Sequence, residues 1–217
     1  MVTSAQQARG SIAMEPTTGQ AGRPSGIGGI VTGMLMRWLN AEMNRVAADR
    51  LDPQHGERIL EIGFGPGHLI EMLAARKPAL VAGIDHSATM FEQAQHRNAE
   101  ALRERRVELT CRSVAELPWL DGSFDKIVAV NSFQFWPEPA RNLEEVRRVM
   151  KPGALLLLVI RGRKANSNAT FAGADRGEQY LSRALFELPH AGFDEITHQT
   201  REAWPYPAIC VRARKPA

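Results

Sequence analysis

A glycine-rich turn that directly follows an apolar segment is the feature that most constrains the fold of this chain. Residues 58–62 read RILEI, and Gly63, Gly65 and Gly67 follow at alternate positions. Apolar residues at helical spacing resume at 69–73. A strand that runs through such a turn into a helix is typical of an open α/β sheet, where glycines let a ligand approach the backbone because they carry no Cβ. This order predicts a ligand site at the carboxyl end of the first strand.

Strands and helices alternate along most of the remaining sequence. We expect strands at 58–62, 80–84, 107–111, 126–130 and after Pro152-Gly153, with helices between them, one of them running from Ser87 through Ala101. The strands are continuously apolar, which is typical of a parallel sheet covered on both faces. Two more strands, at 195–201 and 208–214, are too close in sequence for a parallel crossover. The predicted fold class is therefore α/β, doubly wound and mostly parallel, with a C-terminal antiparallel hairpin.

The N-terminal 33 residues differ in composition from the rest of the chain. They are rich in Gly, Ser, Thr, Gln and Pro and poor in large apolar residues, so they cannot bury enough surface to offset the entropy of ordering. We expect residues 1–33 to form a flexible arm and residues 34–217 to form a single domain. That domain would begin with an amphipathic helix carrying Trp38, a candidate lid over a bound acceptor.

Charge and cysteine content argue against several classes of protein. The 27 Lys and Arg are interspersed with 24 Asp and Glu, for a formal net charge of +3, so no nucleic-acid partner is expected. The longest apolar run, 154–160, is too short for a membrane span, and no secretory signal is recognisable, which favours a cytoplasmic protein. The two cysteines, Cys111 and Cys210, lie in apolar stretches and should be buried and reduced. No ligand spacing indicates a metal site, and no feature indicates an oligomeric state.

The spacing of the glycines indicates which ligand the turn binds. The dinucleotide fingerprint is G-x-G-x-x-G, whereas this turn is G-x-G-x-G with Pro66 inside it, which disfavours a bound pyrophosphate. Asp85 ends the second strand about twenty residues further on, where a carboxylate can accept two hydrogen bonds from a ribose diol. The pattern therefore indicates a ligand that contains a nucleoside. An acid placed at a helix N-terminus only for its charge is the alternative explanation of Asp85.

With these features the chain resembles the class I S-adenosylmethionine-dependent methyltransferases, specifically the small-molecule group called methyltransferase type 11. The resemblance covers about residues 51–161 and includes three further segments, AELPW at 115–119, GSFD at 122–125 and RVMKPG at 148–153. It implies a seven-stranded sheet with a reversed last strand. It also implies an enzyme that transfers a methyl group from S-adenosylmethionine to a small-molecule acceptor by in-line displacement.

The resemblance further implies which residues hold the cofactor. The methionine part would lie beside Glu61 and the turn, the ribose hydroxyls would bind Asp85, and the adenine would lie along His86. The family usually has an acid after the third strand to accept the adenine amino group, and this chain has Ser113 there, which puts adenine selectivity in doubt. The expected cofactor-binding residues are Glu61, Gly63, Phe64, Gly65, Gly67, Asp85, His86, Ser113, Val114 and Asn131.

An aromatic cluster after the fourth strand and a basic residue after the fifth are candidates for acceptor binding. They follow strands at the end of the sheet where ligands bind in such folds, and a ring face also attracts a cationic sulfonium. The alternatives are that the rings pack against the following helix and that the basic residue lies in a solvated loop. The expected substrate-binding residues are Trp38, Phe133, Phe135, Trp136 and Arg161. None of the six histidines is placed by spacing against a second catalytic residue, so no general base is assigned.

Three other functions remain open from the sequence. A nicotinamide-dependent oxidoreductase is disfavoured by the glycine spacing and because Tyr180 is not followed by a lysine four residues later. A nucleic-acid methyltransferase is disfavoured because the fourth strand ends in NSFQ rather than in Asn/Asp-Pro-Pro-aromatic. A cofactor-binding protein without catalysis would carry the same pattern.

Overall fold

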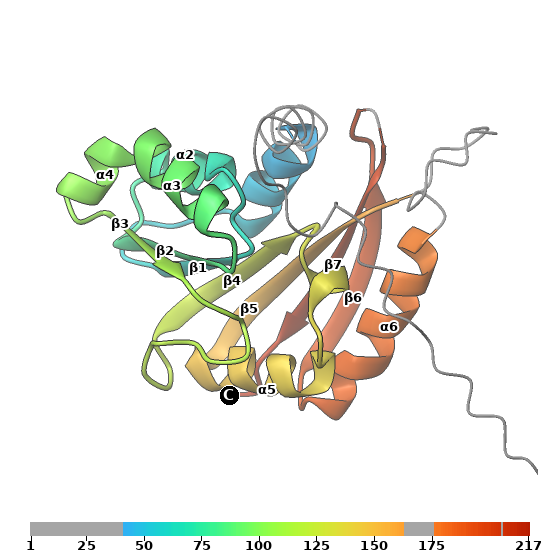
Figure 1. Ribbon diagram of the computed structural model, residues 1–217. Helices are drawn as coiled ribbons and strands as arrows, with labels where there is room; N and C mark the ends of the chain where they lie inside the picture. Colours follow the sequence, from blue (N-terminus) through green and yellow to red (C-terminus); the bar gives the residue numbers. More distant parts are fainter. Residues whose placement is uncertain (1–40, 163–175, 205) are drawn as a thin grey trace, which may run out of the picture.

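The computed structural model describes residues 41–162, 176–204 and 206–217, which form a central sheet flanked by helices (Figure 1). The strands are β1 (Arg58–Ile62), β2 (Leu80–Asp85), β3 (Val107–Cys111), β4 (Phe124–Val130), β5 (Met150–Arg161), β6 (Asp194–Arg201) and β7 (Ala208–Arg214). The helices are α2 (His68–Ala75), α3 (Ala88–Arg97), α4 (Ala99–Arg103), α5 (Pro139–Val149), α6 (Gly177–His190) and a short 3-10 helix, η2 (Phe133–Phe135). The first described residues, 41–51, are also helical, and we call them helix 41–51.

The sheet has seven strands in the order β3-β2-β1-β4-β5-β7-β6. β1 pairs in parallel with both β2 and β4, β2 with β3, and β4 with β5. β7 is antiparallel to β5 and to β6, which confirms the predicted mostly parallel sheet with a C-terminal hairpin. The carboxyl ends of the parallel strands β1, β2 and β4 lie at the same edge of the sheet. The strand order reverses between β1 and β4, and open α/β sheets bind ligands at such a reversal.

Both faces of the sheet are covered by apolar clusters, as the continuously apolar strands predict. Along β5, Leu156 and Leu158 belong to the cluster that contains residues of α5 and α6. Leu157 and Val159 belong to the cluster that contains residues of helix 41–51 and α2. Because successive side chains of a strand point to opposite faces, a strand buried on both sides has no polar alternation.

The helix predicted from Ser87 through Ala101 is interrupted. Its start is as expected, because Ser87 caps α3 by accepting a hydrogen bond from the N–H of Met90. The backbone leaves helical geometry at Asn98, and α4 begins at the next residue. The buried Asn98 amide donates to the carbonyls of Ala94 and Gly67, so this residue serves the adjacent turn rather than the helix.

The expectation that both cysteines are buried is wrong for Cys111. Cys210 on β7 is buried and free, and burial raises the pKa of its thiol to about 11. Cys111 is also free but exposed. It is the last residue of β3, which is an edge strand of the sheet. Because an edge strand has a neighbouring strand on one side only, Cys111 stays exposed although it lies in an apolar stretch of the sequence.

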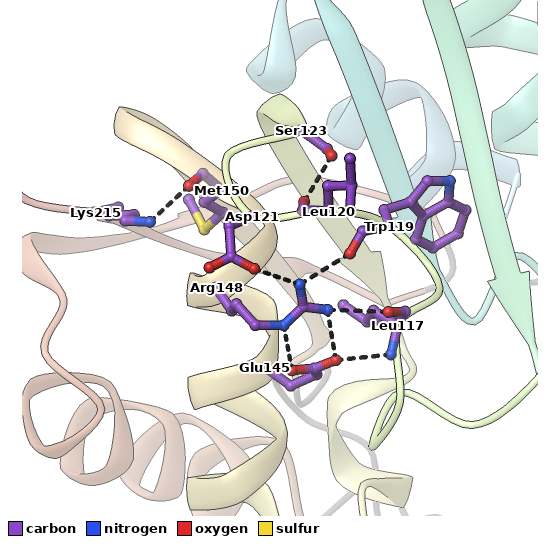
Figure 2. A network of polar contacts seen from close by, with 9 residues as sticks. All are labelled: Leu117, Trp119, Leu120, Asp121, Ser123, Glu145, Arg148, Met150 and Lys215. Atoms are coloured by element: carbon purple, nitrogen blue, oxygen red, sulfur yellow. Dashed lines mark hydrogen bonds and ion pairs between the residues drawn. The ribbon is translucent and has the colours of Figure 1, made fainter.

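Arg148 on α5 fixes the connection between β3 and β4 (Figure 2). Its guanidinium donates to both carboxylate oxygens of Glu145 and to Asp121. It also donates to the carbonyls of Leu117 and Trp119. The hydrogen bonds from Arg148 to Glu145 hold the pKa of this carboxyl below its usual value. One planar side chain with five donors thus ties the segment 117–121 to α5.

The amide of Asn142 on α5 is fully buried, and neither its oxygen nor its nitrogen has a hydrogen-bond partner among the described residues. A buried polar group without a partner costs about 1–3 kcal/mol. We therefore expect Asn142→Leu, which keeps the branched shape of four side-chain heavy atoms, to raise the free energy of unfolding by about 1–3 kcal/mol. Urea unfolding measures this. Glu144→Leu, at an exposed position of the same helix, should give no such gain, and an unchanged or lower stability of Asn142→Leu would contradict the prediction.

Candidate functional site

The glycine turn between β1 and α2 presents an open face at Gly65. Gly63, Gly65 and Gly67 all have positive φ, at 78°, 53° and 79°, a region that other residues rarely adopt. A Cβ on Gly63 would lie 2.5 Å from the Cβ of Ser132, so this glycine is needed for close packing. A Cβ on Gly65 would meet no atom of the described structure within 4 Å. The turn is therefore tightly packed at Gly63 and accessible to a ligand at Gly65.

Asp85 joins this turn to the end of β2. Its Oδ2 accepts a hydrogen bond from the N–H of Gly65 at 2.8 Å, and its Oδ1 accepts one from the N–H of Ser87 at 2.9 Å. The side chain is almost fully buried, so its orientation is fixed. Each carboxylate oxygen has a second lone pair and can accept a further hydrogen bond. The predicted pair of turn and acid is thus brought together, and the acid can still accept bonds from a diol.

Three side chains that the sequence analysis did not single out also hold the turn. Ser132, which follows β4, donates from Oγ to the Ile62 carbonyl at 2.6 Å. Arg97 Nε donates to the Pro66 carbonyl at 3.0 Å, and the Asn98 amide donates to the Gly67 carbonyl at 3.1 Å. No motif spacing identifies them, because they become neighbours of the turn only through the packing of β4 and α3. Only Ser132 had a signal, since it follows the fourth predicted strand, at the end of the sheet where a ligand is expected.

Glu61 is buried in β1 directly below the turn. It is 2% exposed, and one of its carboxylate oxygens has no hydrogen-bond partner among the described residues. Burial, and then the negative charge of Asp85, raise the pKa of Glu61 to about 8, although a hydrogen bond from the backbone of Ile70 acts against this. Glu61 is therefore mostly protonated at neutral pH. A cation placed beside it would favour its ionised form.

The orphaned Glu61 oxygen and the open face of Gly65 fit the cofactor implied by the sequence. S-Adenosylmethionine carries an ammonium group and a sulfonium in its methionine part and a ribose diol next to its adenine. Glu61 offers a buried acceptor for the cationic part, and Asp85 offers acceptors for the diol. Both lie at the same turn.

The three residues expected near the adenine differ in their exposure to solvent. His86 is exposed, with Nδ1 3.8 Å from Oδ1 of Asp85. Ser113 is also exposed, and its Oγ accepts a hydrogen bond from the N–H of Ala115 at 3.2 Å. Val114 is buried. All three follow β2 or β3 at the carboxyl edge.

The ring of Phe64 does not face the open side of the turn. It is buried in the apolar cluster with α2, and its edge fills the space beside Gly83, where a Cβ would lie 2.7 Å from Cδ1. A cofactor at the open face of the turn would therefore meet the backbone of Phe64 rather than its ring.

Asn131 connects the ends of β4 and β5. Its backbone has a positive φ of 49°, which asparagine adopts more readily than most residues. Its Oδ1 accepts a hydrogen bond from the N–H of Arg161 at 3.0 Å, and its Nδ2 lies 3.2 Å from Sδ of Met43. The side chain thus ties helix 41–51 to the edge of the sheet beside the turn.

Of Phe133, Phe135 and Trp136, which follow β4, only Phe135 is exposed. Phe133 and Trp136 are buried in the core, with ring centroids 5.3 Å apart. These two rings point into the core, as in the alternative that they pack within the fold, and their expected contact with an acceptor stays a prediction. The ring of Phe135 is 59% exposed. Trp38 and the proposed lid lie outside the described residues.

Arg161 is the last residue of β5 and is half-buried rather than part of a solvated loop. Its Cζ lies 5.2 Å from the centroid of the Tyr206 ring, and burial lowers the pKa of its guanidinium. Gln134, a residue without a motif signal, has a buried Oε1 with no partner among the described residues. These two residues offer a donor and an acceptor at the carboxyl edge near Asn131.

Two kinds of feature are absent from the residues that the structure describes. Within residues 41–162, 176–204 and 206–217, no group of three or more His, Cys, Asp and Glu side chains could hold a metal ion. No helix in that part of the chain is long and apolar enough to cross a membrane.

The raised pKa of Glu61 predicts a pH-dependent stability. The ordinary pKa of 4.5 applies in the unfolded chain and about 8 in the folded one, so folding stability should fall as the pH rises between these values. Glu61→Gln cannot ionise. Its stability relative to the natural chain should therefore increase from pH 5 to pH 8 by at most about 1.4 kcal/mol per pH unit, as measured by urea unfolding. Glu92→Gln, at an exposed position of α3, is the control, and a pH-independent difference for Glu61→Gln would refute the prediction.

Comparison with known proteins identifies similarity to methyltransferases. Residues 59–153 match a family model described as a methyltransferase domain. The uncharacterized methyltransferase YdaC of Bacillus subtilis is 27% identical over 189 residues, which cover 87% of this chain and 99% of that protein. A demethylmenaquinone methyltransferase of Clavibacter sepedonicus is 34% identical over 128 residues, but the match spans only 51% of its length.

A solved structure has the same fold. The crystal structure of a SAM-dependent methyltransferase from Aquifex aeolicus superposes with a TM-score of 0.67 at 21% identity and covers 85% of this chain and 97% of that one. The matched segment of the family model runs from β1 into β5, so it contains the glycine turn, Glu61 and Asp85. Residues 59–153 therefore match a methyltransferase domain, and the chain has the fold of a SAM-dependent methyltransferase.

Proposed function

We propose that this chain binds S-adenosylmethionine at the glycine turn and transfers its methyl group to a small-molecule acceptor. The observation that carries the proposal is the position of the buried Glu61 carboxyl and the Asp85 carboxylate on either side of a turn whose Gly65 face is open. One acid suits the cationic part of this cofactor, and the other suits its ribose. The bound cofactor supplies an electrophilic methyl group on a sulfonium.

The residues around the turn would act by binding and alignment. Glu61 would ionise against the cationic methionine part, and the backbone from Gly63 through Gly67 would let that part lie close. Asp85 would accept from the ribose hydroxyls, and His86, Ser113 and Val114 would border the adenine. Methyl transfer by in-line displacement requires mainly that donor and acceptor are aligned and water is excluded. We assign no general base.

The acceptor would bind beside the ends of β4 and β5. There the exposed ring of Phe135 offers an apolar surface, while Arg161 offers a cation whose position is fixed by Tyr206. Gln134 adds a buried acceptor atom. The name of one relative, a demethylmenaquinone methyltransferase, supports an apolar small molecule over a nucleic acid. An aromatic acceptor that carries a hydroxyl or carboxylate fits these groups.

Isothermal titration with S-adenosylmethionine and S-adenosylhomocysteine tests the cofactor. We expect saturable binding of both by the natural chain and binding weaker by about tenfold or more in Asp85→Ala, because the charge-assisted hydrogen bonds to turn and ribose are lost. Asp194→Ala, an exposed position at the start of β6, should bind normally. No binding by the natural chain, or equal binding by Asp85→Ala, would overturn the cofactor assignment.

The same samples test the transfer. With a panel of phenols, quinols and aromatic carboxylates, release of S-adenosylhomocysteine should depend on acceptor and be lost in Asp85→Ala. Normal cofactor binding without release for any of these acceptors would refute the acceptor class and leave the cofactor assignment standing.

A further inference from the structure

A charged cleft lies at the edge of the sheet opposite to the glycine turn. It has a volume of about 580 Å³ between the end of helix 41–51 and the strands β5 and β7. A second hollow of about 480 Å³ adjoins it along β6 and β7. The two share Arg50, Leu155, Arg212 and Arg214, so we call them together the arginine cleft. Each volume is in the range of small-molecule sites, about 300–1,000 Å³.

The arginine cleft is remote from the proposed cofactor site. On β7, Arg214 pairs with Leu155 of β5, whereas the carboxyl end of β5 at Arg161 pairs with Ala208. Six residues of strand separate Leu155 from Arg161, a distance of about 20 Å at roughly 3.3 Å per residue. A ligand in the arginine cleft would therefore not touch the glycine turn.

Two of the three arginines in the cleft have no acidic partner among the described residues. Arg214 pairs with Glu195 at 3.0 Å. Arg50 donates to the neutral amide oxygen of Gln199 at 3.0 Å. Arg212 is half-buried, and its side chain has no hydrogen bond or ion pair within the described part of the chain. Two guanidinium groups are therefore partly withdrawn from water without a counter-charge, which favours binding of an anion.

The acids that surround the cleft are already engaged. Glu57 pairs with Lys126 at 2.9 Å, Asp125 pairs with Lys151 at 2.7 Å, and Asp49 pairs with Arg76 outside the cleft. The remaining acid, Asp52, is exposed. These carboxylates do not neutralise Arg50 and Arg212 by direct pairing.

We propose that Arg50 and Arg212 form a binding site for a small anion that carries phosphate groups. Arginine presents a planar fork of donors that matches phosphate oxygens, and two such forks in one cleft suit a diphosphate. Leu155 offers an apolar surface for a non-polar part of the ligand.

Titration calorimetry with inorganic pyrophosphate and with adenosine diphosphate at constant ionic strength tests this proposal. We expect saturable binding that Arg212→Gln and Arg50→Gln each weaken by about tenfold or more. Arg141→Gln removes the same charge from an exposed position of α5, on the other face of the sheet, and should bind normally. Arg212→Lys keeps the charge without the fork and should be intermediate. Tighter binding of adenosine diphosphate would point to a phosphate ester as the ligand, and tighter binding of pyrophosphate would point to the free anion.

Three outcomes would overturn the proposal. They are no saturable binding of either probe, normal binding by both Arg212→Gln and Arg50→Gln, and an equal loss in Arg141→Gln, which would reflect net charge alone. Asp85→Ala separates this site from the cofactor site, because it should leave pyrophosphate binding unchanged. Unfolding curves confirm that each variant is folded, and Arg50→Gln, on the surface of a helix, provides a second test if Arg212→Gln unfolds.

Discussion

The hydrogen bond from the Gly65 N–H to the Asp85 carboxylate is the interaction on which the rest of the site depends. It links the turn after β1 to the end of the neighbouring parallel strand β2, and it fixes both the open face of the turn and the orientation of the acid. Ser132 closes the opposite side through the carbonyl of Ile62. Because β1 lies between β2 and β4, the turn is held from both neighbours. The side chain that orients the turn is also the one best placed to bind a ribose.

Much of this arrangement follows from sequence periodicity, and the rest depends on contacts that periodicity does not encode. Continuous apolar runs locate the strands, and the glycine spacing with Asp85 indicates the ligand. Asn98 interrupts a regular helical pattern because its amide bonds to Gly67, a partner known only after the chain has folded. Similarly, η2 buries Phe133 and Trp136 and exposes Phe135. Three aromatic residues close in sequence therefore have different environments, which composition alone cannot distinguish.

Some sequence segments that resemble the family have a structural role at a distance from the site. Arg148 binds Glu145, Asp121 and the backbone of 117–119 (Figure 2), so the AELPW segment and the arginine on α5 act together to hold this connection.

The two edges of the sheet differ in the charge of their binding groups. Buried acids lie beside the glycine turn, while unpaired arginines lie at the opposite edge, so each edge suits a ligand of different charge.

The most direct test of this account is an amide-resolved NMR titration of the isotopically labelled chain with S-adenosylhomocysteine. The account predicts saturable shifts of the amide resonances of Gly63, Gly65, Asp85 and Ser87, with the amide of Arg212 unchanged. Shifts confined to the arginine cleft, or no shift at Gly65 and Asp85 at any ligand concentration, would contradict the claim that the glycine turn and Asp85 form the cofactor site.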